Sequence, residues 1–333
     1  MPMQAKEKKR ARKPGIKTRY GIGEWYGRSF VRLAPEDRRQ LARVQIMEKA
    51  RRPDFVCPFR SAPGNQVLCT KRGGVCSLRH YQLEEQTQRV SWPTGEASHL
   101  VTTCPHRFKQ GGLIFSWIGE NLLGCRDPLI VGEVGFLEQE SVPSRGDARP
   151  ADAEDVGRID NVLAHPARVP LHWTALEIQA VYFSGPSMSR QFRALRKSRS
   201  NALPFPVAIR RPDYRSSGPK RLMPQLQIKV PTLRRWGKKM AVVVDHSFFA
   251  ALGSMDDVHD VSNCDIAWFV VDYDESGGEF ALKPAFMRMT TLERAVEGLT
   301  GGNPVSLSLF EQRIREKLAE KYPGAEANPN PDQ

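Results

Sequence analysis

Three polar side chains lie in two apolar runs near the middle of the chain. Asp160 follows the run V-G-R-I, and Glu177 and Gln179 lie in the run H-W-T-A-L-E-I-Q-A-V-Y-F. Because Pro166 and Pro170 fall between these runs, we predict a strand, a loop and a second strand. Opposed residues of an antiparallel pair share a midpoint, and the midpoint of Asp160 and Glu177 falls within the loop. The two carboxylates are therefore predicted to be cross-strand neighbours.

Strand alternation places Gln179 on the same face as Glu177. Two carboxylates brought together among apolar side chains repel each other and lose hydration, and a divalent cation between them offsets both costs. Oxygen ligands alone favour Mg²⁺, which assists the attack of water on a phosphodiester. These residues therefore predict metal-dependent hydrolysis of a phosphate ester. The plainer alternative is that Asp160 ends a strand and Glu177 faces solvent.

The charge and the cysteine content narrow the class of protein. The chain has 333 residues, a formal net charge of +13 and a pI of about 9.6. This charge favours polyanions, most simply nucleic acid, although a ribosomal or membrane surface would also fit it. No apolar run of about 18 residues and no secretory signal is visible, so we expect a cytoplasmic, bacterial protein without a membrane span. Its six cysteines then favour thiols or metal ligands over disulfides.

Four of the cysteines lie close together in the sequence, beside turn-forming glycines and prolines: Cys57, Cys69, Cys76 and Cys104. Four thiolates suit a tetrahedral metal site, and both iron and zinc accept them. The spacing lacks the paired C-x2-C of common zinc ribbons, so four buried or scattered free thiols remain the alternative. Cys125 and Cys264 lie in apolar surroundings and are predicted to be plain core residues.

The amino-acid sequences of these segments resemble those of a known family. C-T-K-R-G-G-V-C-S-L-R and T-T-C-P-H-R-F, followed by D-x16-E-x-Q, resemble the NotI family of type II restriction endonucleases. D-x16-E-x-Q also looks like the PD-(D/E)xK nuclease motif, with Gln179 in the position of the lysine. Gln179 can orient a water molecule but cannot supply a positive charge. The resemblance implies an α/β fold with a PD-(D/E)xK restriction-endonuclease-like core, a mixed sheet flanked by helices, and an N-terminal Cys₄ metal-binding element.

The resemblance also implies an activity and its cofactors. It implies a homodimeric, Mg²⁺-dependent endonuclease that hydrolyses double-stranded DNA at a GC-rich palindrome. This palindrome contains GGCC and is up to eight base pairs long. Carried over residue by residue, it implies that Asp160, Glu177 and Gln179 are catalytic and that the two acids bind Mg²⁺. The four cysteines would hold a structural iron, with zinc as the alternative. A cognate DNA methyltransferase is expected in the host as a separate protein.

Two other functions remain open. The glutamine in the third motif position would also suit a non-catalytic, sequence-specific DNA-binding protein on a degenerate nuclease fold. A repair or mobile-element nuclease without sequence specificity would carry the same carboxylates. Four further acids could assist the catalytic metal, namely Glu120, Glu133, Glu154 and Asp155. For Glu120 and Glu133, a position on the surface is the plainer expectation.

We expect four regions along the chain. Residues 1–20 are predicted to form a basic disordered arm, and residues 21–110 a helix together with the Cys₄ element. Residues 111–322 are predicted to form the nuclease core with its DNA-recognition loops, and residues 323–333 a disordered tail. The core should therefore contain the strands that position Asp160 and Glu177.

Two basic segments follow the catalytic hairpin, and both are predicted to contact DNA. The first is a helix whose apolar residues Met188, Phe192 and Leu195 pack on the sheet. The second, residues 201–240, is Pro-rich and is predicted to form long irregular loops, where recognition residues usually lie. Arginine reads guanine in the major groove, whereas a merely solvated basic surface is the alternative. The predicted contacts are Arg190, Arg193, Arg196, Lys197, Arg210, Arg211, Arg215, Lys220 and Arg221.

Overall fold

A computed structural model describes residues 15–93, 100–139, 154–275, 279–301 and 305–322. Most of the predicted basic arm and the whole predicted tail lie outside these residues. The chain divides into two compact units, Met1–Thr300 and Gly301–Gln333. The larger unit therefore spans the predicted division at residue 110, and both sheets described below belong to it.

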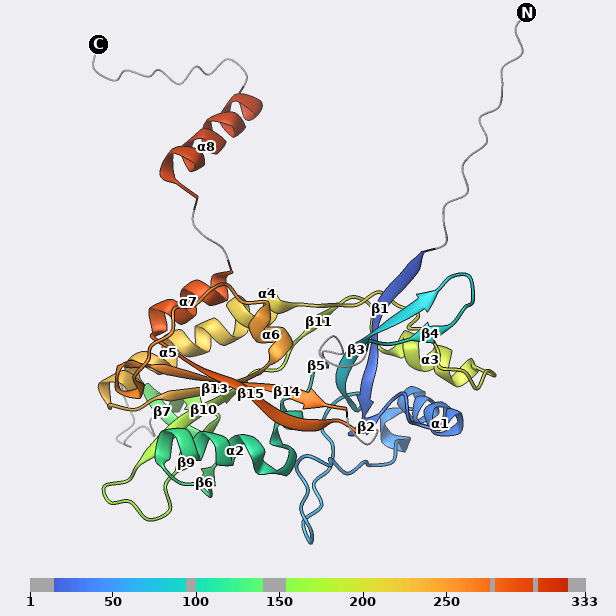
Figure 1. The fold of residues 1–333 in the computed structure, drawn as a ribbon, viewed down its shortest axis with the longest axis horizontal. Helices are drawn as coiled ribbons and strands as arrows, with labels where there is room; N and C mark the ends of the chain where they lie inside the picture. The colour runs from blue at the N-terminus through green and yellow to red at the C-terminus, as the bar shows by residue number, and fades with distance from the viewer. Residues whose placement is uncertain (1–14, 94–99, 140–153, 276–278, 302–304, 323–333) are drawn as a thin grey trace, which may run out of the picture. The chain divides into compact units, whose positions relative to one another are not determined.

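The larger unit is built on a six-stranded sheet with the strand order β15-β14-β13-β10-β9-β6 (Figure 1). Strands β10, β13 and β14 are parallel, and the other neighbours in the sheet are antiparallel. The molecule is thus mixed α/β with a mixed sheet, as predicted. The strands are β6 (Leu129–Val131), β9 (Asn161–Ala164), β10 (Trp173–Ile178), β13 (Met240–Asp245), β14 (Ile266–Asp274) and β15 (Ala281–Thr290).

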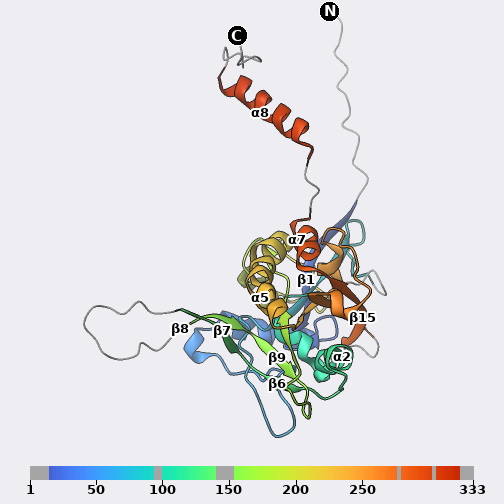
Figure 2. The ribbon, with the colours of Figure 1, turned by 90° about the vertical axis from the view of Figure 1, so that its left-hand side faces the viewer.

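Helices cover both faces of this sheet. Every residue of β13 is buried, which accounts for its continuous apolar run. Val242 and Val244 face the core that holds α5 (Met223–Arg235) and α7 (Leu292–Thr300), whereas Ala241 and Val243 face the core that holds α2 (Leu113–Ile118). The view turned by 90° shows α5 and α7 on one side of the sheet and α2 on the other (Figure 2).

The Pro-rich segment after residue 201 is more helical than its sequence suggested. The predicted irregular loop is helical from Tyr214 to Arg235, through α4 (Tyr214–Ser217), η5 (Gly218–Leu222) and α5. Pro224 lies in the first turn of α5. Pro231 lies inside the helix, where burial of Val230 and Leu233 outweighs the break that proline favours. The prediction of a loop over this half of the segment was wrong.

A second sheet occupies the region that was predicted to hold one helix and the cysteines. Its strand order is β2-β1-β3-β4, with β5 paired to β3. Residues 16–20, assigned by prediction to the disordered arm, form the start of β1 and pair with β3. The elements are β1 (Ile16–Trp25), β2 (Arg28–Ser29), α1 (Pro35–Ile46), η1 (Lys49–Arg51), β3 (Val75–Glu84), β4 (Val90–Ser91), β5 (Val101–Thr102) and η3 (Pro105–Gly112).

The basic helix α3 (Ser189–Lys197) packs on this second sheet and not on the central one. Its Phe192 ring stacks on Trp25 with the ring centroids 5.2 Å apart, in the cluster that also holds Ala42 of α1. The remaining elements of the larger unit are η4 (Gly119–Leu123), β7 (Val134–Gln139), β8 (Glu154–Ile159), β11 (Phe183–Ser184), β12 (Arg211–Pro212), α6 (His246–Ala250) and η6 (Val261–Asn263).

A buried ion pair joins the second sheet to the rest of the larger unit. The Arg107 side chain of η3 is fully buried, and its Nε lies 2.8 and 2.9 Å from the two carboxylate oxygens of Glu24 on β1. Arg107 Nη2 donates to the Phe280 carbonyl at 2.7 Å, and the Ser77 hydroxyl donates to Glu24 at 2.8 Å. Each charged group is therefore satisfied from within the protein.

The smaller unit contains α8 (Leu307–Lys321). Its apolar side chains are exposed, including Leu309, Ile314 and Leu318. Within the described part of the chain, no helix combines the length and apolar character that crossing a bilayer requires.

Candidate active site

Strands β9 and β10 form the predicted antiparallel hairpin. Ala164 pairs with Trp173 and Asn161 with Leu176. Asp160 directly precedes β9, and continuing this register by one residue places it opposite Glu177. The arithmetic on the sequence therefore gave the register of the structure, since an antiparallel ladder without a bulge keeps one midpoint throughout.

All three predicted catalytic side chains line one cavity of about 420 Å³. The backbone N–H of Gln179 donates to the Val243 carbonyl at 3.0 Å, so the chain continues along β13 for one residue beyond β10. Asp160, Glu177 and Gln179 therefore lie at the same end of the sheet, where β9 begins and β10 ends. The other residues that line the cavity are Lys71, Thr103, Pro105, Ile178, Ala180, Tyr182, Lys220, Arg221, Pro224 and Gln225.

A lysine that the sequence analysis did not predict lies between the two carboxylates. Lys229 on α5 places its Nζ 2.8 Å from Glu177 Oε2 and 3.5 Å from Asp160 Oδ1. Glu177 pairs in register with Val242, whose face of the sheet is the one that α5 covers. Lys229 lies in the buried stripe of α5 with Leu226 and Leu233, so a lysine at an apolar helical position was the available signal.

The two carboxylates differ in their exposure. The side chain of Glu177 is 9% exposed and that of Asp160 is 58% exposed. Burial raises the pKa of Glu177, while the nearby Lys229 ammonium opposes this rise and the Asp160 charge adds to it. With both acids ionised, two negative charges face a single positive charge, and this imbalance suits a further cation.

The side chain of Gln179 is turned toward its own backbone. Its Nε2 donates to the Ala180 carbonyl at 2.6 Å, and the residue is largely buried. This donor is therefore engaged within the chain, and the residue in the lysine position of the motif brings no charge to the cavity. Lys229, from a different element, is the cation closest to Glu177 among the ion pairs of the described residues.

Three further basic side chains line the same cavity. Lys220 and Arg221 were predicted to contact DNA, and Lys71 comes from the turn between Cys69 and Cys76. The Arg221 guanidinium lies 3.6 Å from the centre of the Tyr182 ring, which fixes its orientation. These cations surround the two acids with positive charge, as a site for a phosphodiester requires.

The other predicted DNA contacts are spread over several elements. Arg210 is buried, and its guanidinium donates to the carbonyls of Pro186 at 3.1 Å and Ser187 at 3.0 Å. We therefore correct its assignment from a contact on a recognition loop to a side chain that braces the chain before α3. The remaining basic residues are exposed, on α3 (Arg190, Arg193, Arg196 and Lys197), on β12 (Arg211) and on α4 (Arg215).

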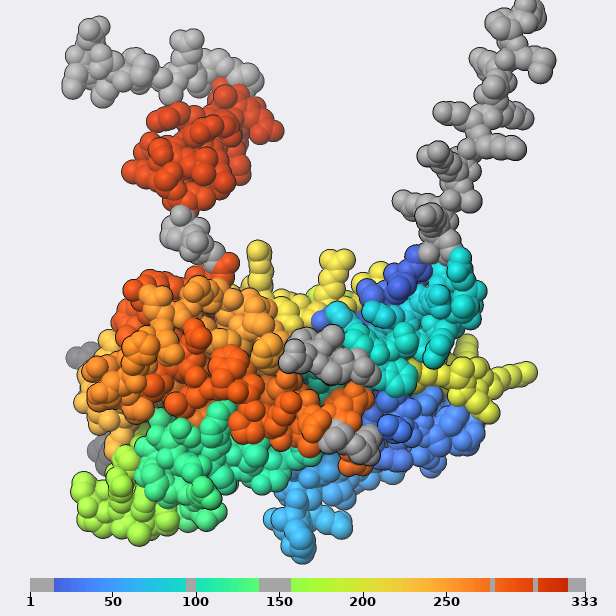
Figure 3. All heavy atoms as spheres, in the orientation of Figure 1, coloured from blue at the N-terminus to red at the C-terminus, as the bar shows by residue number. Residues whose placement is uncertain are grey.

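The four cysteines come from separate segments that meet beside this cavity. Cys57, Cys76 and Phe59 form a small buried cluster against which Cys69 packs. The backbone N–H of Cys104 donates to the Cys76 carbonyl at 3.1 Å. The light-blue segment that contains Cys57 and Cys69 stands out from the surface in the space-filling view (Figure 3).

The thiols of this group influence one another. Burial is the largest cause of the raised pKa of Cys69, Cys76 and Cys104, and in each case the charge of neighbouring cysteines raises it further. The donor types therefore fit a thiophilic cation. However, among the residues that the structure describes, no three His, Cys, Asp or Glu side chains are arranged as ligands of one metal ion.

Two of the four candidate accessory acids do not join the site. Glu120 pairs with Arg126 at 3.1 Å and Glu133 with Arg158 at 3.1 Å, and neither acid lines the cavity of Asp160. The side chains of residues 154 and 155 lie outside the described part of the chain. The acids that line the cavity are thus Asp160 and Glu177.

Comparison with known protein families gives a match. The sequence model of a family described as Restriction endonuclease NotI matches residues 38–282. The matched span covers well over half of the 333 residues and includes the cysteines, the β9–β10 hairpin and Lys229. No curated protein matches the chain.

Proposed function

The chain belongs to the restriction endonuclease NotI family, and from this premise we propose that Asp160, Glu177 and Lys229 form its active site. As a member of that family it is a type II, site-specific deoxyribonuclease that binds double-stranded DNA. One observation carries the assignment: two cross-strand carboxylates and a buried lysine meet at a cavity with a basic lining. That combination of charges suits phosphodiester hydrolysis.

Mg²⁺ is the proposed cofactor, and Asp160 and Glu177 would hold it. The fit rests on the donors, because two carboxylates that face one ammonium leave a negative charge for a hard cation to offset. When bound, Mg²⁺ supplies Lewis-acid stabilisation of the phosphate oxygens and makes water more acidic. The exposed side of Asp160 leaves room for the phosphate to approach.

The protein's own residues supply positioning and positive charge. Lys229 donates to Glu177, which holds that carboxylate toward the cavity. Its ammonium also places a fixed positive charge where negative charge develops on the phosphate during attack. Gln179 retains its side-chain carbonyl for orienting the attacking water, in keeping with the role that its motif position implies.

The target is proposed to be a GC-rich palindrome that contains GGCC and is up to eight base pairs long. A two-fold site is matched by a two-fold protein, so we propose a homodimer. Lys220 and Arg221, which line the cavity, are the proposed contacts nearest to the cleaved strand. A separate methyltransferase in the host would protect the same palindrome.

The four cysteines are proposed to hold a structural iron, with zinc as the alternative. Their burial, their effect on one another's pKa and their thiolate chemistry support this proposal. Metal analysis of the purified protein, with Cys76→Ser alongside, tests it. We expect about one equivalent of metal in the wild type and a lower content with a lower Tm in the variant. A metal-free wild type with the same Tm as the variant would contradict it.

The activity is tested by digesting a large GC-rich DNA with the purified protein and sequencing the ends. The incubations contain Mg²⁺, Ca²⁺ or a chelator, and light scattering gives the mass of the protein on a short duplex. We expect discrete ends at one palindrome in Mg²⁺ alone, and a mass of two protomers on one duplex. Products of mixed size would favour the non-specific nuclease, and uncut DNA with tight binding would favour the non-catalytic reading.

A further inference from the structure

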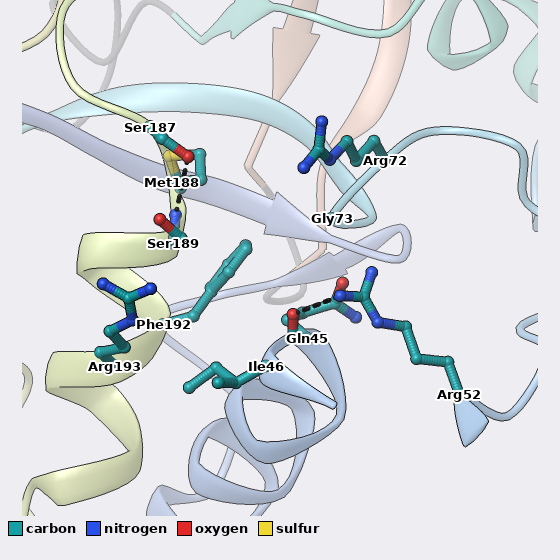
Figure 4. A pocket seen from close by; sticks show the side chains of 10 residues that line it. All are labelled: Gln45, Ile46, Arg52, Arg72, Gly73, Ser187, Met188, Ser189, Phe192 and Arg193. Atoms are coloured by element: carbon teal, nitrogen blue, oxygen red, sulfur yellow. Dashed lines mark hydrogen bonds between the residues drawn. The ribbon is translucent and has the colours of Figure 1, made fainter. Parts of the chain in front are cut away.

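Several hollows adjoin one another around a single turn, residues 71–74. The active-site cavity shares Lys71 and Thr103 with a second cavity of about 240 Å³. The second cavity shares Arg72, Ser187 and Met188 with a third of about 380 Å³, which lies between α1 and α3 (Figure 4). The shared residues show that the hollows follow one another outward from the carboxylates.

The turn that these hollows share is held in place. The Gly74 N–H donates to the Lys71 carbonyl at 3.0 Å, and the Trp25 indole N–H donates to the Gly73 carbonyl at 2.8 Å. Gly73 and Gly74 both have positive φ, at +82° and +66°. A Cβ on Gly74 would lie 2.2 Å from the Tyr26 ring, so glycine is required at this position of the turn.

The outer hollows carry positive charge alone. Arg72 and the buried Arg210 line the second cavity together with Lys71, and Arg52 and Arg193 line the third. Neither lining includes an aspartate or a glutamate among the described residues. Figure 4 shows Arg72, Arg52 and Arg193 grouped around the third hollow, with the Arg52 guanidinium held by the Gln45 carbonyl at 2.9 Å.

These cations differ from two exposed arginines elsewhere on the larger unit. Arg126 and Arg158 each pair with a glutamate. The side chains of Arg72 and Arg193 are exposed and form no hydrogen bond or ion pair with any residue that the structure describes. Arg210 Nη1 is buried and likewise has no partner there. Lys71, Arg72 and Arg193 form no ion pair with any residue that the structure describes, and such a group of cations is suited to a polyanion.

We propose that the Lys71–Gly74 turn is a phosphate-binding element that guides one DNA strand from the active site toward α1 and α3. Lys71 would contact the phosphate next to the cleaved one, since it lines both the active-site cavity and the second cavity. Arg72 would contact phosphates further along the strand. This inference rests on the proposed function for its substrate, and it gives the turn between Cys69 and Cys76 a direct role in binding.

The salt dependence of DNA binding tests the role of Arg72. Full-length wild type, Arg72→Ala and the control Arg126→Ala are titrated onto duplexes with and without the palindrome, in Ca²⁺ and over a range of salt concentrations. Loss of one phosphate contact lowers the slope of log K against log salt by about 1. We expect this change for Arg72→Ala on both duplexes and no change for Arg126→Ala. Their Tm values should match that of the wild type.

Two results would overturn the proposal. An unchanged slope in Arg72→Ala shows that this arginine does not contact phosphate. A loss confined to the duplex with the palindrome shows that it contacts a base. Should Arg72→Ala have a lower Tm, Arg72→Gln provides the same comparison with the side-chain stem kept. If the wild type binds DNA but cuts none, the proposed function fails while the slopes still test the turn.

Discussion

Two buried glutamates of this protein each face a cation at a similar distance. Glu24 pairs with Arg107, and Glu177 pairs with Lys229, each at 2.8 Å. Both members of the first pair have further hydrogen-bond partners inside the protein: Glu24 accepts from the Ser77 hydroxyl, and Arg107 donates to the Phe280 carbonyl. Around Glu177 a second acid and an open cavity leave the charge unbalanced.

This difference separates a structural ion pair from the ion pair that we propose to act in catalysis. A closed pair is satisfied by the fold and offers nothing to a ligand, whereas an open pair with an excess of negative charge offers a cation and a phosphate a place to bind. Burial raises the pKa of both glutamates. A raised pKa alone therefore does not identify the active site, and access from solvent has to be considered as well.

The largest expected effect comes from opening the closed pair. Arg107→Met leaves the Glu24 carboxylate buried without its cation, so we expect a loss of about 3–5 kcal/mol in the free energy of unfolding. Urea denaturation measures it, with Arg126→Met as a control for an exposed ion pair. A loss below about 1 kcal/mol would mean that Glu24 and Arg107 do not carry the structural role assigned to them.

Changing the cation of the open pair should affect cleavage before it affects folding. For Lys229→Met we expect single-turnover cleavage to slow by about 10²- to 10³-fold, because one fixed charge near the reacting phosphate is lost. Mg²⁺ should also raise the Tm of this variant more than that of the wild type, since the two carboxylates then lack an internal cation. Lys229→Arg keeps the charge and serves as the control. Cleavage at the wild-type rate in Lys229→Met would remove this lysine from the site.

Asp245 is a third buried acid, and it differs from Glu24 and Glu177 because its hydrogen bonds come from backbone N–H groups and not from a cation. It accepts from Thr102 at 2.7 Å and from Phe248 at 2.8 Å, and burial raises its pKa from 3.8 to about 6. A raised pKa means that folding favours the protonated form. The stability that this proton contributes is present below pH 3.8 and is lost as the pH rises through about 6.

Urea denaturation at several pH values measures this contribution. Between pH 4 and pH 7 the wild type should lose up to about 3 kcal/mol relative to Asp245→Asn, since each pKa unit corresponds to about 1.4 kcal/mol. A difference between the two proteins that stays constant over this range would show that Asp245 keeps the same charge throughout.

The smallest effect is expected at a partly buried acid that caps a helix. Asp213 accepts from the Ser216 N–H at 2.9 Å and from the Ser216 hydroxyl at 2.7 Å at the start of α4. Asp213→Ala should lower the free energy of unfolding by about 1 kcal/mol and leave the cleavage rate unchanged. A larger loss, or a change in cleavage, would mean that this acid has a role beyond the cap.

The sequence was informative where geometry is local. The pairing of Asp160 with Glu177 follows from one midpoint, and the strands around residues 240 and 270 follow from continuous apolar runs. The place of Lys229 in the candidate site was not predicted, because the prolines of its segment suggested a loop. Pro224 and Pro231 are nevertheless both accommodated in α5. The burial of Arg210 depends on carbonyls more than 20 residues away in the sequence, which no local pattern reports.

Single-turnover cleavage by Glu177→Gln, measured beside its thermal unfolding, tests the central claim most directly. This variant keeps the shape of the side chain and an acceptor for Lys229, and it removes the charge proposed to hold Mg²⁺. We predict a folded protein that binds the duplex and cleaves it at least about 10³-fold more slowly than the wild type. Cleavage at the wild-type rate by a folded Glu177→Gln would contradict the assignment of the active site to this cavity.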